Sequence, residues 1–131
     1  QKKRFFSADT PTIICKSSSR IADETESDYI VSFTSSGNTP KICSKLHAPI
    51  SILSPTDNLY ICRHMCLYRG VIPRLMPKQC KDSERWRDMI DVFIQIAQEK
   101  RLLKVKDKLV VLAGIPIGTS GGLNSIRLVT V

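Results

Sequence analysis

The apolar and polar positions of this chain fall into alternating segments of helical and extended type. Apolar residues recur at a helical spacing over 12–25, and the compact β-rich run 29–33 follows. The same succession continues to the end of the chain. It predicts further helices at 40–48, 58–68 and 84–101, and further strands at 50–54, 71–75, 109–113 and 126–131.

Capping and turn residues indicate where these segments begin and end. Thr39 is suited to cap the second helix, and Pro40 to occupy its first position. Gly70 is expected to end the third helix, because glycine adopts the left-handed conformation at little cost. Ser83 is expected to cap the longest helix, which carries a broad apolar stripe.

Helices that alternate with strands are typical of an α/β fold, in which helices cover both faces of a mostly parallel sheet. We therefore expect a three-layer α/β/α sandwich with a five-stranded sheet. The glycine-rich segment before the last strand is too short for a helical crossover, so that strand is expected to be antiparallel. The 131 residues suit one domain, predicted at 11–131, with 1–10 as a linker or tail.

The composition is that of an ordinary globular protein, with 42% hydrophobic and 24% charged residues. No run comes near the ~20 apolar residues that cross a bilayer, so no membrane association is expected. The five cysteines are odd in number and include no CxxC pair, which favours free thiols in a reducing compartment. We expect a cytoplasmic protein or, alternatively, one of an organelle.

Charge and aromatic content bear on the partners. The net charge of +8 favours anionic partners, and a local basic cluster spans Lys100 to Lys108. Such a cluster is either a contact for nucleic acid or a solvated surface. Aromatic residues make up only 6% of the chain, and no predicted strand interleaves them with basic residues. These features argue against nucleic acid, and a basic nucleic-acid-binding module is kept as the alternative function.

Two loops that follow predicted strands are candidates for anion binding, because ligands of open α/β sheets bind beyond the carboxyl ends of the strands. The loop Thr34–Thr39 offers hydroxyls and a glycine beside the positive end of a helix dipole. The loop Gly118–Gly122 offers a glycine-rich backbone. Each loop alone is also consistent with an ordinary tight turn, whereas both at one sheet edge favour a phosphate site. Neither matches the P-loop or the dinucleotide fingerprint.

Groups able to catalyse a reaction or bind a metal are few. Cys62 and Cys66 share a helical face, but His64 points elsewhere, and a tetrahedral site needs further ligands. We therefore expect these cysteines to be buried small hydrophobes. Trp86 is expected either to stack on a ligand or to anchor the core. No catalytic residue and no metal ligand is assigned.

Four segments resemble pyruvate kinases, in the order and near the spacing of that family. They are the loop Thr34–Thr39, the stretch Leu67–Pro73 that reads LYRGVIP, the approach to a strand at Leu102–Asp107, and the terminus Ala113–Arg127 that reads AGIPIGTSGGLNSIR. The resemblance covers about 12–131. It identifies the chain as similar to the C-terminal domain of that family, separated from the catalytic barrel.

The resemblance implies a division of labour. The family binds phosphoenolpyruvate, ADP, magnesium and potassium on a catalytic barrel, so neither a cofactor nor catalysis is expected in this domain. The domain is expected to contact the barrel of the same chain, to form one interface of a tetramer, and to bind an effector such as a sugar phosphate or AMP. The parent enzyme would transfer a phosphoryl group from phosphoenolpyruvate to ADP in glycolysis, giving pyruvate and ATP.

The resemblance also assigns residues. The loop that holds an effector phosphate corresponds to Thr34, Ser35, Ser36, Gly37, Asn38 and Thr39, and the loop that closes over the effector corresponds to Thr119, Ser120, Gly121 and Gly122. Trp86 and Arg87 lie near the residues that contact a second phosphate in some members. Ser35, Asn38 and Ile117 stand where some members carry Lys, Arg and Arg, so either a single phosphate or no effector at all is expected rather than a bisphosphate.

Overall fold

The computed structural model describes residues 10–77, 86–114 and 123–131, except for the side chains of 86, 87, 114, 123 and 124. Helices and strands alternate along the described chain, as the sequence predicts. They are α1 (Thr10–Glu24), β1 (Tyr29–Ser32), α2 (Asn38–Lys45), β2 (Ile52–Thr56), α3 (Leu59–Met65), β3 (Val71–Leu75), α4 (Trp86–Glu99), β4 (Lys108–Gly114) and β5 (Leu123–Thr130). The predicted tail falls on 1–9, outside the described residues, and on Thr10, which begins α1.

The strands form one five-stranded sheet in the order β3-β2-β1-β4-β5. The first three pairings across this order are parallel, and β4 pairs with β5 antiparallel. The register places Ile30 beside Ile52 on one side and beside Val110 on the other. The mostly parallel sheet with an antiparallel last strand is therefore confirmed.

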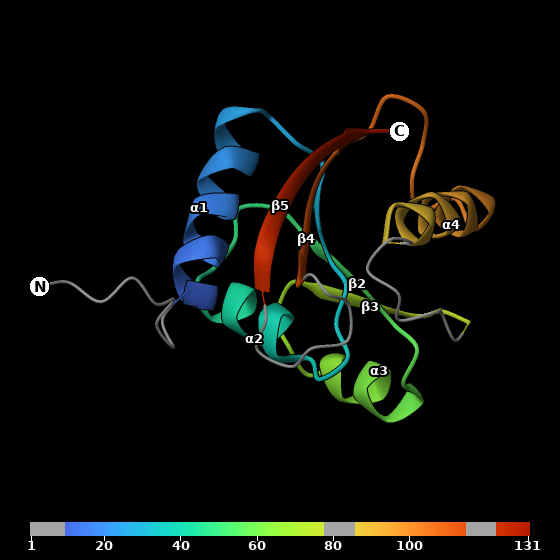
Figure 1. Cartoon of the computed structure of the whole chain (residues 1–131), viewed down its shortest axis with the longest axis horizontal. Helices are drawn as coiled ribbons and strands as arrows, with labels where there is room; N and C mark the ends of the chain where they lie inside the picture. Colours follow the sequence, from blue (N-terminus) through green and yellow to red (C-terminus); the bar gives the residue numbers. More distant parts are fainter. Residues whose placement is uncertain (1–9, 78–85, 115–122) are drawn as a thin grey trace, which may run out of the picture.

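Helices cover both faces of this sheet, which confirms the three-layer sandwich (Figure 1). Helices α1, α2 and α3 pack on one face, where Cys15, Cys43 and Met65 join the strand residues Ile30 and Val110 in a single buried cluster. Helix α4 covers the other face. Its buried residues Ile90, Phe93 and Ala97 form a second cluster with Val31, Leu53, Leu109 and Val111.

Strand β4 shows why the sequence places the sheet at the centre. Its apolar run from Leu109 to Ala113 is almost completely inaccessible to solvent on both faces. Parallel strands covered by helices on both sides bury every side chain, so their sequences are continuously apolar rather than alternating. Burial of one such aliphatic side chain contributes roughly 1.5–3 kcal/mol.

Strand β2 begins and ends two residues later than predicted. It runs from Ile52 to Thr56 and includes Pro55, which the predicted strand 50–54 leaves out. The carbonyl of Pro55 accepts a hydrogen bond from the N–H of Thr34 at 3.1 Å, so its missing N–H also points toward β1. Because β1 has already ended at Ser32, the proline interrupts no ladder bond there.

Helix α3 is shorter than predicted and ends at Met65. Beyond it the N–H groups of Cys66, Leu67 and Tyr68 bond to carbonyls three residues back, so the chain tightens into turns. Gly70 adopts the left-handed conformation, with φ 78°, but it ends these turns and not the helix, so the predicted helix end was wrong.

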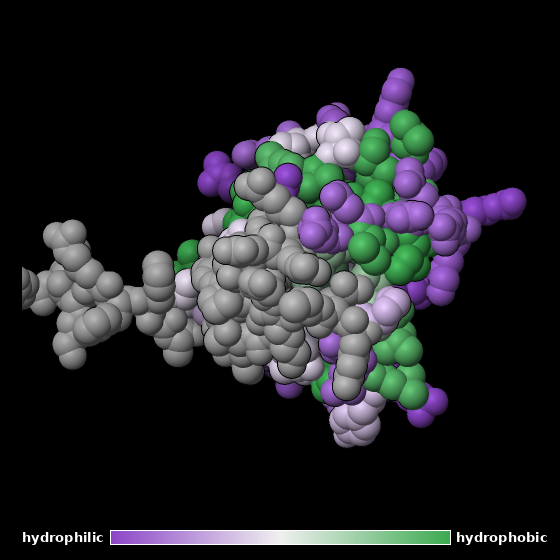
Figure 2. Space-filling model, turned by 45° about the vertical axis from the view of Figure 1, so that its right-hand side comes forward, coloured by the Kyte–Doolittle hydropathy of each residue, from purple (hydrophilic) through white to green (hydrophobic). Residues whose placement is uncertain are grey.

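Apolar side chains also reach the surface. Figure 2 shows them on one face of the molecule as several separate patches among polar residues. The large exposed hydrophobic residues of the described chain are Ile13, Leu59, Tyr60, Leu67, Leu75, Val105 and Leu128. Scattered apolar residues are normal on a protein surface, but four of these seven lie on or beside α3 and β3. Among the described helices, none is long and apolar enough to cross a membrane.

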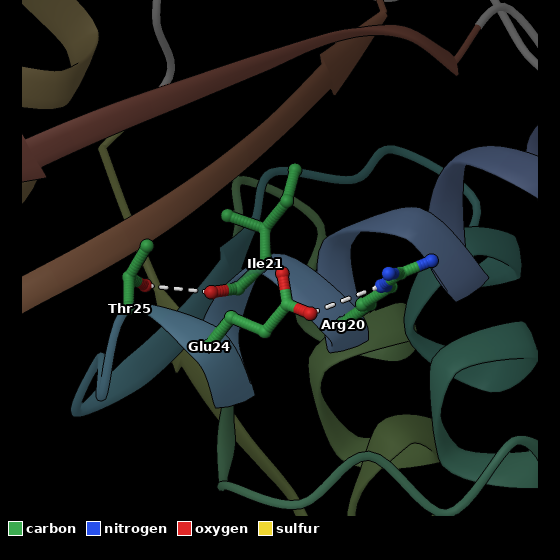
Figure 3. A network of polar contacts seen from close by, with 4 residues as sticks. All are labelled: Arg20, Ile21, Glu24 and Thr25. Atoms are coloured by element: carbon green, nitrogen blue, oxygen red, sulfur yellow. Dashed lines mark hydrogen bonds and ion pairs between the residues drawn. The ribbon is translucent and has the colours of Figure 1, made fainter.

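Helix α1 ends in a local network of polar contacts (Figure 3). The hydroxyl of Thr25 donates to the carbonyl of Ile21 at 2.6 Å, and Arg20 forms an ion pair with Glu24 at 3.2 Å. The same carbonyl also accepts the backbone N–H of Thr25 at 2.9 Å, so the hydroxyl adds a second hydrogen bond to it. The ion pair is exposed, so it contributes at most about 1 kcal/mol.

Candidate functional site

The loop predicted at Thr34–Thr39 leaves the sheet at the carboxyl end of β1, and its last two residues already belong to the first turn of α2. The bond from the N–H of Thr34 to the carbonyl of Pro55 fixes its first residue against β2. Ser35, Ser36 and Asn38 are exposed at the tip of the loop. The loop is therefore anchored at its base and open to solvent where its hydroxyls lie.

Gly37 determines how the loop enters the helix. It adopts the left-handed conformation, with φ 80° and ψ 3°, and is the N-cap of α2. The Thr34 hydroxyl accepts a hydrogen bond from its N–H at 2.7 Å, and its carbonyl accepts one from the N–H of Lys41 at 3.2 Å. The predicted cap was wrong, because the helix begins at Asn38 and places Thr39 and Pro40 inside its first turn. Proline is tolerated there, since first-turn N–H groups have no partner within the helix.

The glycine is also buried against α3. A Cβ at Gly37 would lie 3.4 Å from Cγ2 of Ile61 and 3.5 Å from Cγ of Met65, which are ordinary van der Waals distances. Helix α3 thus supports the loop from below. Sequence reasoning missed Pro55, Ile61 and Met65 as supporting residues, since nothing in their spacing shows that they meet the loop.

The geometry suits an anion more than a catalytic reaction. The Ser36 hydroxyl accepts from the N–H of Asn38 at 3.3 Å, which is a long bond. Within the described part of the chain, no acceptor bonds the N–H of Ser36 or Thr39. Free N–H groups, hydroxyls and the positive end of a helix dipole together can hold a phosphate group. The structure thus keeps the loop's donors available, although the N–H of Gly37 is occupied by Thr34.

The other predicted site residues cannot be placed against this loop. Thr119, Ser120, Gly121 and Gly122 lie outside the described residues. Trp86 and Arg87 begin α4, but their side chains are also outside the description. The assignment of a closing loop and of a second-phosphate contact therefore stays a prediction.

The cysteines differ from their prediction in part. Cys15 and Cys43 are completely buried. A hydrogen bond between their thiols lowers the pKa of Cys15, against the effect of burial, and the same bond together with burial raises the pKa of Cys43. Cys62 is half-buried and Cys66 is exposed, contrary to the expected burial, because α3 lies at the surface. Burial, and then the neighbouring Cys66, raises the pKa of the Cys62 thiol.

No metal centre is formed by the described residues, in which no three His, Cys, Asp or Glu side chains come together. Cys62 and Cys66 are linked only by a weak contact, from the Cys66 thiol to the Cys62 carbonyl at 3.7 Å. His64 instead lies between Tyr60 and Tyr68, with its ring centroid 6.3 Å and 5.6 Å from theirs.

An open hollow of about 320 Å³ lies at the amino ends of β1 and β2, on the side of the sheet away from the loop Thr34–Thr39. Its lining residues are Asp28, Tyr29, Ile50, Ser51, Lys104 and Asp107. Both carboxylates are engaged by the backbone: Asp28 accepts from the N–H of Lys108 at 2.8 Å, and Asp107 from that of Lys104 at 2.9 Å. These aspartates therefore stabilise the turns of the chain, and one oxygen of each carboxylate is already occupied by a backbone N–H.

Comparison with known proteins places this geometry in a family. Residues 12–129 match the α/β domain of pyruvate kinase. The chain belongs to the pyruvate kinase α/β domain family. It is 29% identical to a pyruvate kinase of Lactococcus lactis subsp. lactis over 98% of this chain and 25% of that relative. A pyruvate kinase of Agrobacterium vitis is 28% identical over 90% of the chain and 24% of its own length, and one of Geobacillus stearothermophilus is 31% identical over 76% and 16%.

The predicted pyruvate kinase C-terminal domain is thereby confirmed. The chain spans a quarter or less of the length of these relatives.

Proposed function

We propose that this chain is the regulatory and oligomerisation domain of a pyruvate kinase, and that its loop Thr34–Thr39 binds the phosphate of a sugar phosphate or of AMP. The parent enzyme would transfer a phosphoryl group from phosphoenolpyruvate to ADP. We expect no such transfer by the domain alone, because the chain spans a quarter or less of the length of the pyruvate kinases that it matches.

One observation carries the proposal of a phosphate site. The left-handed Gly37 turns the backbone so that the loop's hydroxyls and the N-terminus of α2 lie at the same end of the sheet, beyond the carboxyl end of β1. Ligands of open α/β sheets bind at that end. A dianionic phosphate there would gain charge-assisted hydrogen bonds, which are about twice as strong as neutral ones.

Calorimetric titration of the domain with fructose 1,6-bisphosphate, glucose 6-phosphate, ribose 5-phosphate and AMP tests this site. We expect at least one of them to bind. In the variant Asn38→Asp binding should be lost, because the new carboxylate repels the phosphate. The same carboxylate should leave thermal stability unchanged or slightly higher, since an acid in the first turn complements the helix dipole by roughly 0.3–1 kcal/mol.

The matched control is Asn58→Asp, which makes the same chemical change at the N-cap of α3. Asn58 is exposed and its side chain accepts from the N–H of Ile61 at 3.1 Å, a role that aspartate fulfils equally well. Binding should survive in this control. An equal loss in both variants would show a long-range charge effect, and binding of no metabolite would refute the phosphate site.

The edge of the sheet supports the proposed role in assembly. Strand β5 is an edge strand of eight residues, and its Leu128 is 57% exposed. A long edge strand offers unpaired backbone groups for pairing with a second copy. The other edge, β3, has five residues and contains Pro73, which donates no hydrogen bond. We therefore propose that two copies pair through β5.

Sedimentation of paired variants tests this assembly. Leu128→Lys should shift the domain toward the monomer, whereas Leu75→Lys on β3 should not, although Leu75 is similarly exposed at 46%. A wild-type domain that remains monomeric at high concentration, or equal effects of both lysines, would refute pairing through β5.

A further inference from the structure

The charges of the described surface are unevenly distributed. Between Tyr29 and Pro77 the sequence holds five basic residues and a single acid, Asp57. The basic residues are Lys41 and Lys45 on α2, Arg63 on α3, Arg69 in the turn after it, and Arg74 on β3. The two helices are joined at this surface, since the Ser44 hydroxyl donates to the carbonyl of Arg69 at 2.7 Å.

No carboxylate among the described residues forms an ion pair with these cations, whereas Arg20 on α1 does pair with Glu24. Lys41, Lys45, Arg63 and Arg69 are all exposed. Their charges are therefore available to phosphate groups, which form strong contacts with unpaired Arg and Lys at a surface.

Aromatic side chains alternate along the sequence with Arg63 of α3 and with Arg69 of the turn after it. Tyr60, His64 and Tyr68 follow one another at intervals of four residues, so they lie along one side of the helix and of the turn that continues it. The rings of Tyr60 and His64 are nearly parallel, at 10°, and that of Tyr68 stands at 88° to His64. Tyr60 is 75% exposed and the neighbouring Leu67 78%, so the series is open to solvent at its outer end.

We propose that this α2–α3 face, made by Lys41, Lys45, Tyr60, Arg63, His64 and Arg69, binds single-stranded nucleic acid. The cations would follow the phosphate backbone, and an unpaired base would stack on the open ring of Tyr60. This combination of a basic track and exposed rings is the usual means of holding single strands without sequence preference. The sequence pattern argued against nucleic acid because no predicted strand interleaves aromatic and basic residues, whereas here the rings lie along α3 and the cations lie on α2, on α3 and in the turn after it.

Fluorescence anisotropy with a labelled 15-mer of uridine tests the proposal in the isolated domain. We expect saturable binding whose affinity falls steeply with salt. Tyr60→Ala should weaken binding about tenfold, as the loss of one stacked base does. The logarithm of the binding constant falls linearly with the logarithm of the salt concentration. Arg63→Glu and Arg69→Glu should each make this slope shallower by about 0.7, the amount expected for one lost phosphate contact with a single strand.

Matched variants separate this face from net charge. Lys104→Glu makes the same kind of charge reversal in the other basic cluster, and it should leave binding nearly unchanged. An equal loss from Lys104→Glu would reduce the face to nonspecific attraction and overturn the proposal. So would a Tyr60→Ala variant that weakens binding of RNA no more than binding of heparin, because heparin has no bases to stack on the ring. Absence of RNA binding, together with self-association abolished by Leu67→Asp, would overturn it in favour of a protein contact. None of these outcomes involves the metabolite titrations above.

Discussion

The left-handed conformation of Gly37 yields a quantitative prediction. In Gly37→Ala the new Cβ would meet Ile61 and Met65 at ordinary distances, so packing contributes little to the change. The backbone at φ 80° contributes more, because an L-residue in this region is disfavoured by roughly 1–2 kcal/mol relative to glycine. Alanine also restricts the unfolded chain, which offsets about 0.4–1 kcal/mol of this cost. We expect a net destabilisation of about 1 kcal/mol.

Gly70→Ala is the matched comparison. Gly70 has nearly the same φ, 78°, and nothing lies within 4 Å of the Cβ that would be added. Urea denaturation followed by circular dichroism should show both variants with midpoints about 0.5 M below the wild type, for a slope near 2 kcal/mol per molar. Thermal midpoints should fall by roughly 3–4 °C.

Two results would contradict this reasoning. If Gly37→Ala is as stable as the wild type while Gly70→Ala is not, the loop does not hold Gly37 in the left-handed region. If Gly37→Ala instead loses more than about 3 kcal/mol, steric overlap with α3 rather than backbone strain dominates, and such overpacking has a cost of that size.

Other substitutions test the core and the thiols. Phe93→Ala should destabilise the domain by about 3–5 kcal/mol in urea denaturation, because Phe93 is fully buried between α4 and the sheet. Ser54→Ala should lower the free energy of unfolding by about 1 kcal/mol, since its hydroxyl donates to the carbonyl of Ser32 at 2.8 Å. Ser32→Ala should leave the stability unchanged or raise it, because within the described structure the buried Ser32 hydroxyl has no partner. In alkylation followed by mass spectrometry at pH 7.5, Cys66 should react first and Cys62 more slowly, since Cys66 is exposed and burial raises the pKa of Cys62. Equal rates would contradict that order.

Much of the fold follows from local patterns in the sequence. The continuous apolar run of β4 predicts a strand buried on both faces, and the long apolar stripe of α4 predicts a helix packed on that sheet. The short segment between β4 and β5 predicts their antiparallel pairing. These predictions succeeded because burial periodicity and connection length act over a few neighbouring residues.

The errors have a common cause in contacts between distant segments. Pro55 looked like a turn residue, and only the end of β1 beside it permits a proline inside β2. Thr39 looked like a helix cap, yet the bond from the N–H of Gly37 to Thr34 begins α2 earlier. Cys66 has the apolar character of a core residue, but α3 turns that side of the helix to solvent.

The sequence by itself determined the fold class, the order of the elements and the loop Thr34–Thr39, because these depend on local propensity, hydrophobic period and glycine placement. Only the tertiary structure decided what surrounds that loop and what the surface presents. Ile61 and Met65 support Gly37 from another helix, and the Ser44 hydroxyl of α2 bonds to the Arg69 carbonyl beyond α3, because packing on the sheet brings together residues that no sequence interval relates.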